Sequence, residues 1–125
     1  EDKKKHNKLQ KKLQKEVEVY TNMQKEYRKA VTQKQQLDSQ LNENKAVKEE
    51  LALLKKDSEV YKLIGPVLVK QDLEEARQNV AKRMEYISKE IKRTDDHICA
   101  LENKSLVVEN SLHTKYQSTD YTILY

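Results

Sequence analysis

The only glycine and the only proline of this 125-residue chain are neighbours, at Gly65 and Pro66. An average globular domain contains about 7% Gly and about 5% Pro, because tight turns need these residues. A single Gly-Pro step therefore leaves room for one tight turn near the middle of the chain and for few others. This argues against sandwiches, barrels and βαβ folds within one chain, and against enzymes that bind phosphate on a glycine-rich loop.

The residues around this step predict a β-hairpin over 59–70. β-Branched and aromatic residues are dense on both sides of it, as is typical of strands. Two strands, Val60–Ile64 and Val67–Lys70, would flank a two-residue turn. Glycine can adopt the positive φ that such a turn needs at its first position, and proline suits the negative φ that follows.

The part of the chain after the hairpin has a strict heptad pattern from Leu73 to Leu112. Nine of its twelve ladder positions are apolar, and the exceptions are Arg77, Thr94 and Ser105. Spacing of 3.5 residues over several heptads predicts a coiled-coil helix. Asp72, with Glu75 three residues later, is typical of a helix N-cap. We expect this helix over 72–116 and a tail over 117–125.

The part before the hairpin predicts a first helix over 9–56. Its apolar residues recur mostly every three or four positions, which places them on one stripe. Two steps of six residues, across Lys34 and Asn44, interrupt that stripe. Charged residues make up 37% of the chain, as in long helices rich in Lys, Glu, Gln and Leu. The predicted fold is mainly α: one domain, 1–125, made of a long antiparallel two-helix coiled coil with a β-hairpin at its base.

The predicted hairpin has apolar residues on both faces and unpaired backbone groups on both edges. A lone hairpin is marginally stable in water, and open edges favour pairing with another chain. One interpretation is that the hairpin folds back on its own helices. The other, which we prefer, is that several copies pair into a sheet or barrel through the hairpin residues Val60, Tyr61, Leu63, Ile64, Gly65, Pro66, Val67, Leu68 and Val69.

Four stretches of this region resemble prefoldin β-class subunits: 43–54, 60–71, 75–77 and 82–87. The resemblance covers about residues 41–93, and outside it only coiled-coil character matches. It implies a heterohexamer of two α-class and four β-class subunits, whose hairpins form barrels from which the coiled coils project. It also implies a cytoplasmic complex that captures unfolded polypeptides, notably actin and tubulin, and passes them to the cytosolic chaperonin without ATP.

If the family's mechanism applies, the free end of the coiled coil binds clients. Apolar side chains there would contact apolar surface of an unfolded chain, and several weak contacts together would give useful avidity. The alternative is that the same side chains simply pack the last turns of the coil. The candidate client-binding residues are Leu9, Leu13, Val17, Val108, Leu112 and Tyr116.

The same end is strongly basic. Within residues 1–15, seven lysines stand against Glu1 and Asp2, a balance of +5, whereas the whole chain has a net charge of +4. Such a cluster can steer acidic clients in a salt-dependent manner. The alternative is a solvated run that keeps the end soluble. The lysines are Lys3, Lys4, Lys5, Lys8, Lys11, Lys12 and Lys15.

Other function classes have weaker support. His97 and Cys99, two residues apart on a helix, point to different faces, so we expect no metal site, and we expect no cofactor or catalytic residue. No apolar run is long enough for a membrane span, and the lone cysteine suits a reducing compartment. A structural coiled-coil adaptor is an alternative. A basic coiled coil that binds nucleic acid is another, although the lysines lack a base-reading Asn/Arg cluster.

Overall fold

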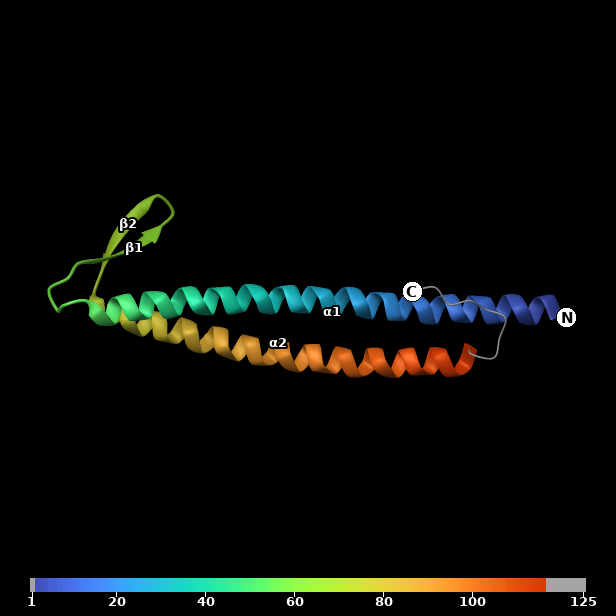
Figure 1. Ribbon diagram of the computed structural model, residues 1–125. Coiled ribbons are helices and arrows are strands. Elements are labelled where there is room, and N and C mark those ends of the chain that lie inside the picture. The colour runs from blue at the N-terminus through green and yellow to red at the C-terminus, as the bar shows by residue number, and fades with distance from the viewer. Residues whose placement is uncertain (1, 117–125) are drawn as a thin grey trace. The chain divides into compact units, whose positions relative to one another are not determined.

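The computed structural model describes residues 2–116 as two long helices with a hairpin between them in sequence (Figure 1). The elements are α1 (Asp2–Leu53), β1 (Val60–Ile64), β2 (Val67–Gln71) and α2 (Leu73–Tyr116). The predicted tail over 117–125 lies outside the described residues. The mainly α fold with an antiparallel hairpin is confirmed.

The chain divides into two compact units, which we describe separately. Of the described residues, the first unit contains 2–32 and 95–116, and the second contains 33–94. In each unit, a segment of α1 lies beside a segment of α2. The interpretation of 1–125 as a single domain stays a prediction.

The heptad pattern of α2 matches its burial. Each of the twelve ladder positions between Leu73 and Leu112 is buried or half-buried. The three polar exceptions have hydrogen-bond partners. The Thr94 hydroxyl donates to the Glu90 carbonyl at 2.8 Å, and Ser105 Oγ accepts a bond from Gln24 Nε2 at 2.7 Å. Arg77 binds carbonyl groups at the end of α1. Polar groups in the seam are therefore tolerated because each is satisfied.

The two polar residues that were expected to interrupt the α1 stripe instead continue it. Lys34 is half-buried and Asn44 is only 9% exposed. The Asn44 amide donates to the Gln40 carbonyl at 2.8 Å, and its oxygen accepts a bond from Arg83 at 3.5 Å. The expectation of two gaps was wrong because a buried amide can occupy a seam position when its own polar groups are paired.

The helix boundaries differ from the predicted ones at three points. Helix α1 begins at Asp2 rather than at residue 9, because lysine favours helix and the first turns need no apolar face. It ends at Leu53 rather than at residue 56. Helix α2 begins at Leu73, one residue later than predicted, because Asp72 is its N-cap: the Glu75 N–H donates to Asp72 Oδ2 at 3.3 Å.

A contact from α2 explains the early end of α1. The Leu51 carbonyl accepts hydrogen bonds from Arg77 Nε at 3.2 Å and Nη2 at 2.9 Å. In a continuing helix the N–H four residues later would bond to this carbonyl. The Leu54 N–H reaches Leu51 in a tighter turn at 3.4 Å, and the Leu54 carbonyl also accepts a bond from Arg77. A residue 23 positions away thus caps the helix, which no local pattern indicates.

Candidate assembly and client-binding surfaces

The hairpin has the predicted register and turn. Strands β1 and β2 are antiparallel, with Ile64 paired to Val67 and Leu63 to Leu68. Gly65 has φ of +58°, and no described non-glycine residue has a positive φ. Positive φ followed by the fixed negative φ of Pro66 is the backbone of a type II′ turn. Strand β2 extends one residue further than expected, because Gln71 pairs with Val60.

Apolar side chains cover both faces of the hairpin. Cross-strand partners share a face, so Leu63 and Leu68 lie on one face and Ile64 and Val67 on the other. Leu63 is 68% exposed and Leu68 is 65% exposed. We define the hairpin surface as the six exposed large apolar residues of the two strands: Tyr61, Leu63, Ile64, Val67, Leu68 and Val69.

The other end of the hairpin is anchored within the second unit. Val60 is half-buried and packs against a cluster of Leu51, Leu73, Ala76 and Val80. At the surface, Glu59 accepts a hydrogen bond from the Tyr61 hydroxyl at 2.8 Å and lies 3.8 Å from Lys70 Nζ. The bond to Glu59 raises the pKa of the Tyr61 phenol. The strands thus begin on a core and continue into solvent.

The predicted client-binding residues face into the helix pair of the first unit. Leu9, Leu13, Val17 and Val108 are half-buried, and Leu112 is 1% exposed. The side chain of Tyr116 lies outside the described residues. Among the described residues of this unit, sequence reasoning missed three apolar residues that are more than half exposed: Val19, Leu106 and Val107. They lie outside the heptad ladder, and an apolar residue at such a position indicates an exposed apolar side chain.

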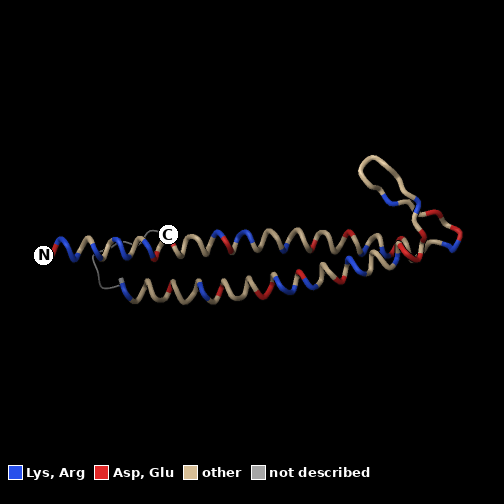
Figure 2. Tube along the Cα trace, turned by 180° about the vertical axis from the view of Figure 1, so that it is seen from behind, with Lys and Arg blue, Asp and Glu red and all other residues tan. Residues whose placement is uncertain are grey.

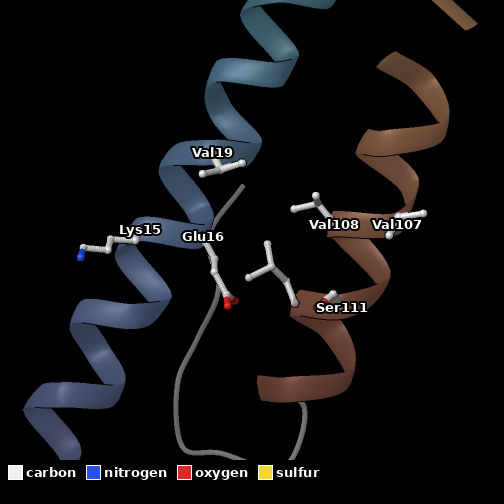
Figure 3. Close-up of a pocket in the computed structure, with 7 residues that line it drawn as sticks. Lys15, Glu16, Val19, Val107, Val108 and Ser111 are labelled. Carbon is white, nitrogen blue, oxygen red and sulfur yellow. The ribbon is translucent and has the colours of Figure 1, made fainter. Parts of the chain in front are cut away.

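Two of these exposed valines border a groove between α1 and α2 (Figure 3). Its volume is about 320 Å³. We call it the valine groove and define it by its lining residues: Lys15, Glu16, Val19, Val107, Val108, Ser111 and Leu112. On one side, Glu16 Oε1 binds Lys115 Nζ at 3.0 Å, which joins the two helices beside the groove.

The seven predicted lysines are all exposed and all belong to the first four turns of α1 (Figure 2). Six of them lie N-terminal to Leu13, and the seventh, Lys15, lines the valine groove. The basic cluster and the groove therefore belong to the same unit. None of the described residues forms a group of three His, Cys, Asp or Glu that could hold a metal ion.

The comparisons with known proteins agree with this architecture. The family described as "Prefoldin subunit" matches residues 14–119. The chain belongs to the prefoldin subunit family.

Sequence relatives in this family are named as one particular subunit. The chain is 57% identical to "Probable prefoldin subunit 6" of Drosophila melanogaster over 111 residues, which are 87% of this chain and 86% of the relative. It is 54% identical to "Prefoldin subunit 6" of Mus musculus over 97 residues, which are 78% of this chain and 76% of the relative. The predicted resemblance to prefoldin subunits is therefore confirmed, and among them the chain is similar to eukaryotic prefoldin subunit 6.

The fold also matches a solved prefoldin. The crystal structure of the prefoldin beta subunit from Thermococcus strain KS-1 aligns with a TM-score of 0.77, covering 86% of this chain and 95% of that one, at 20% identity. At this identity the match shows the fold alone. Prefoldin subunits are non-enzymatic chaperone subunits, consistent with the prediction that the chain is not an enzyme. No helix within residues 2–116 is both long and apolar enough to cross a membrane.

Proposed function

We propose that this chain is a β-class subunit of a heterohexameric holdase with two α-class and four β-class subunits. The complex holds unfolded polypeptides, actin and tubulin among them, and passes them to the cytosolic chaperonin in the cytoplasm without using ATP. The observation that carries this proposal is the hairpin surface: six large apolar side chains on two faces, each at least 44% exposed, in a chain that belongs to a family of chaperone subunits.

The hairpin surface supports the assembly part of the proposal. Burying one Leu or Val side chain contributes roughly 1.5–3 kcal/mol. A partner chain that covers the six residues of the hairpin surface would therefore be bound with a large favourable free energy. Within residues 2–116, no third strand pairs with either edge of the two-stranded sheet, so both edges can pair with strands of another chain. Intersubunit strand pairing would satisfy the backbone groups and cover the apolar side chains together.

The first unit supports the client-binding part. The valine groove offers apolar surface at the side of the helix pair, and the exposed lysines offer positive charge that steers acidic chains. Leu9, Leu13, Val17, Val108, Leu112 and Tyr116 would join this surface when the helix ends separate. Each contact is small, so release stays easy, while several subunits acting together raise the effective concentration of binding sites.

The test measures assembly of the complex first and its suppression of actin aggregation second. Light scattering would measure the mass of this chain alone, and then of the chain mixed with an α-class prefoldin subunit. We expect a species of hexamer mass only in the mixture. That species should suppress aggregation of actin diluted from denaturant and, without added ATP, deliver actin to purified chaperonin. A chain that stays monomeric with its partner, or a hexamer that leaves actin aggregation unchanged, would contradict the proposal.

A further inference from the structure

The valine groove has the shape and lining of a site for an aliphatic side chain. Val19 and Val107 line it and remain 52% and 67% exposed, whereas Leu112, which also lines it, is buried. Figure 3 shows Val19 and Val108 reaching towards each other from the two helices. An incoming Leu, Ile or Val would bury these exposed methyl groups together with its own.

A line of lysines continues from this groove along α1. Residues three or four apart lie on one helix face, and Val19 is followed towards the N-terminus by lysines at steps of four, four, three and four. We define the lysine stripe as these four residues, Lys15, Lys11, Lys8 and Lys4. All four are exposed, and none of them forms an ion pair with another described residue. The stripe thus presents one sign of charge along a single face.

Glu16 adds a hydrogen-bond acceptor at the same place. Its Oε1 is paired with Lys115, but its Oε2 is buried and has no hydrogen-bond partner. A buried acceptor without a donor is unfavourable, and pairing it is a gain for any ligand that brings an N–H group. The main chain of an extended peptide carries such donors at every residue except proline.

We propose that the valine groove and the lysine stripe form one composite site. It binds an extended segment of an unfolded client in which acidic residues stand two and four positions from an aliphatic residue. This inference rests on the proposed function, because it names the client segments that the first unit holds. The positive stripe selects carboxylates, and the apolar groove selects the aliphatic side chain.

The spacing follows from the rise of the two structures. A helix rises about 1.5 Å per residue, so Lys15 and Lys11 lie about 6 and about 12 Å along the axis from Val19. An extended chain rises about 3.3 Å per residue, and its alternate side chains share one side. Residues two and four positions from the aliphatic residue therefore align with Lys15 and Lys11.

Three labelled peptides test the spacing by fluorescence anisotropy against the assembled complex. Each is 13 residues long with a central Leu in a Ser background. The first has Asp two and four positions away on both sides, the second has Asp one and three positions away, and the third has Asn in place of the first peptide's Asp. We expect the first to bind about fivefold more tightly than either of the others. Equal binding of the two Asp peptides would overturn the proposal in favour of unspecific charge attraction.

Paired variants locate the site. Val107→Gln should abolish the preference for the first peptide, whereas Leu106→Gln, at the exposed neighbour outside the groove, should keep it. Replacing Lys8, Lys11 and Lys15 by Gln should also abolish the preference for the first peptide. A charge-matched control replaces three exposed lysines elsewhere: Lys25, Lys29 and Lys45. The proposal would be overturned if Leu106→Gln reduced the preference as much as Val107→Gln, or if the control lysine variant reduced it as much as the stripe variant.

One parallel measurement separates this inference from the proposed function. The unmodified complex is tested for suppression of actin aggregation in the same buffer. If actin is held but the peptides bind alike, the composite site is wrong and the holdase function stands. If actin is not held, the holdase function itself fails.

Discussion

The hairpin of the second unit exposes its apolar side chains, whereas the helix pair of the first unit buries those of its seam. In the hairpin, Leu63 and Leu68 are each about two-thirds exposed. In the helix pair, Leu112 is 1% exposed, and Leu101 is 5% exposed. The helix pair buries its seam with residues of its own chain, whereas the described residues provide no cover for the hairpin surface.

Under the proposed function, this difference would distinguish a surface for stable subunit assembly from a surface for transient client binding. A two-stranded sheet with apolar faces is incomplete alone, so the free energy of covering it is large and favours a stable interface. The helix pair is already packed, and only the side groove and a few off-seam residues remain for binding. Such a surface supports weak contacts, which suits a chaperone subunit that must release what it binds.

The largest expected effect comes from placing charge on the hairpin surface. The double variant Leu63→Asp, Leu68→Asp puts two carboxylates on the same face, because the two residues are cross-strand partners. Burying an unpaired carboxylate is strongly unfavourable, so the hexamer-sized species should disappear in light scattering. Helical content by circular dichroism should remain, because both side chains are mostly exposed in the chain itself.

A matched control uses exposed apolar residues of the helices. Leu106→Asp and Tyr86→Asp replace residues that are 57% and 65% exposed, on α2 rather than on the hairpin. Assembly should persist in both. If these variants dissociate the complex as the hairpin variant does, assembly would not depend on the hairpin surface in particular.

The next effect should appear in the first unit and leave assembly intact. A chain that lacks residues 1–12 and 113–125 loses six of the seven lysines and the Lys115–Glu16 pair beside the valine groove. We expect the hexamer to form, while the amount of complex needed to suppress actin aggregation rises about tenfold, because multivalent binding loses its individual contacts. Unchanged suppression would contradict the assignment of client binding to this end of the helices.

The contrast between the two regions also decides what the sequence could predict. The hairpin followed from the single Gly-Pro step and the β-branched residues around it, and the α2 seam followed from its heptads. Both depend on local chemistry. The end of α1 depends on Arg77, whose guanidinium competes for the Leu51 carbonyl from 26 positions away, so propensity alone placed the boundary too late.

The candidate site was harder to predict than the fold for a related reason. Leu9, Leu13, Val17, Val108 and Leu112 were chosen because they continue the seam, and seam positions are the ones that a coiled coil buries. Val19 and Val107 interrupt the polar outer face, so they looked like exceptions to the pattern. Exposed apolar residues that break a heptad are better candidates for binding than the heptad itself.

A smaller effect should follow from removing the contact between Arg77 and the carbonyl groups at the end of α1. Arg77→Met keeps the apolar stem but removes the bonds to the Leu51 and Leu54 carbonyls. Hydrogen bonds to a charged group contribute about 1.5–3 kcal/mol, so the free energy of unfolding in urea should fall by about that amount. Arg93→Met, which removes only a surface pair with Glu90 in the same helix, should leave it nearly unchanged. Equal losses would mean that the cap contributes no more than a surface pair.

The smallest expected effect is a pH dependence between the helices of the first unit. The Tyr27 hydroxyl donates to Glu102 Oε1 at 3.1 Å, and this bond, with the charge of Glu102, raises the pKa of the phenol above 10.0. Because the folded chain holds the proton more tightly than the unfolded chain, the contribution is complete below pH 10 and is lost as the pH rises through the raised pKa. The melting temperature of the unmodified chain should therefore differ from that of Tyr27→Phe by a constant amount up to about pH 10 and approach it only at higher pH. Tyr86→Phe, at an exposed tyrosine, controls for the loss of a hydroxyl group. If the difference in melting temperature between the unmodified chain and Tyr27→Phe stayed constant over the whole pH range, the bond would contribute nothing.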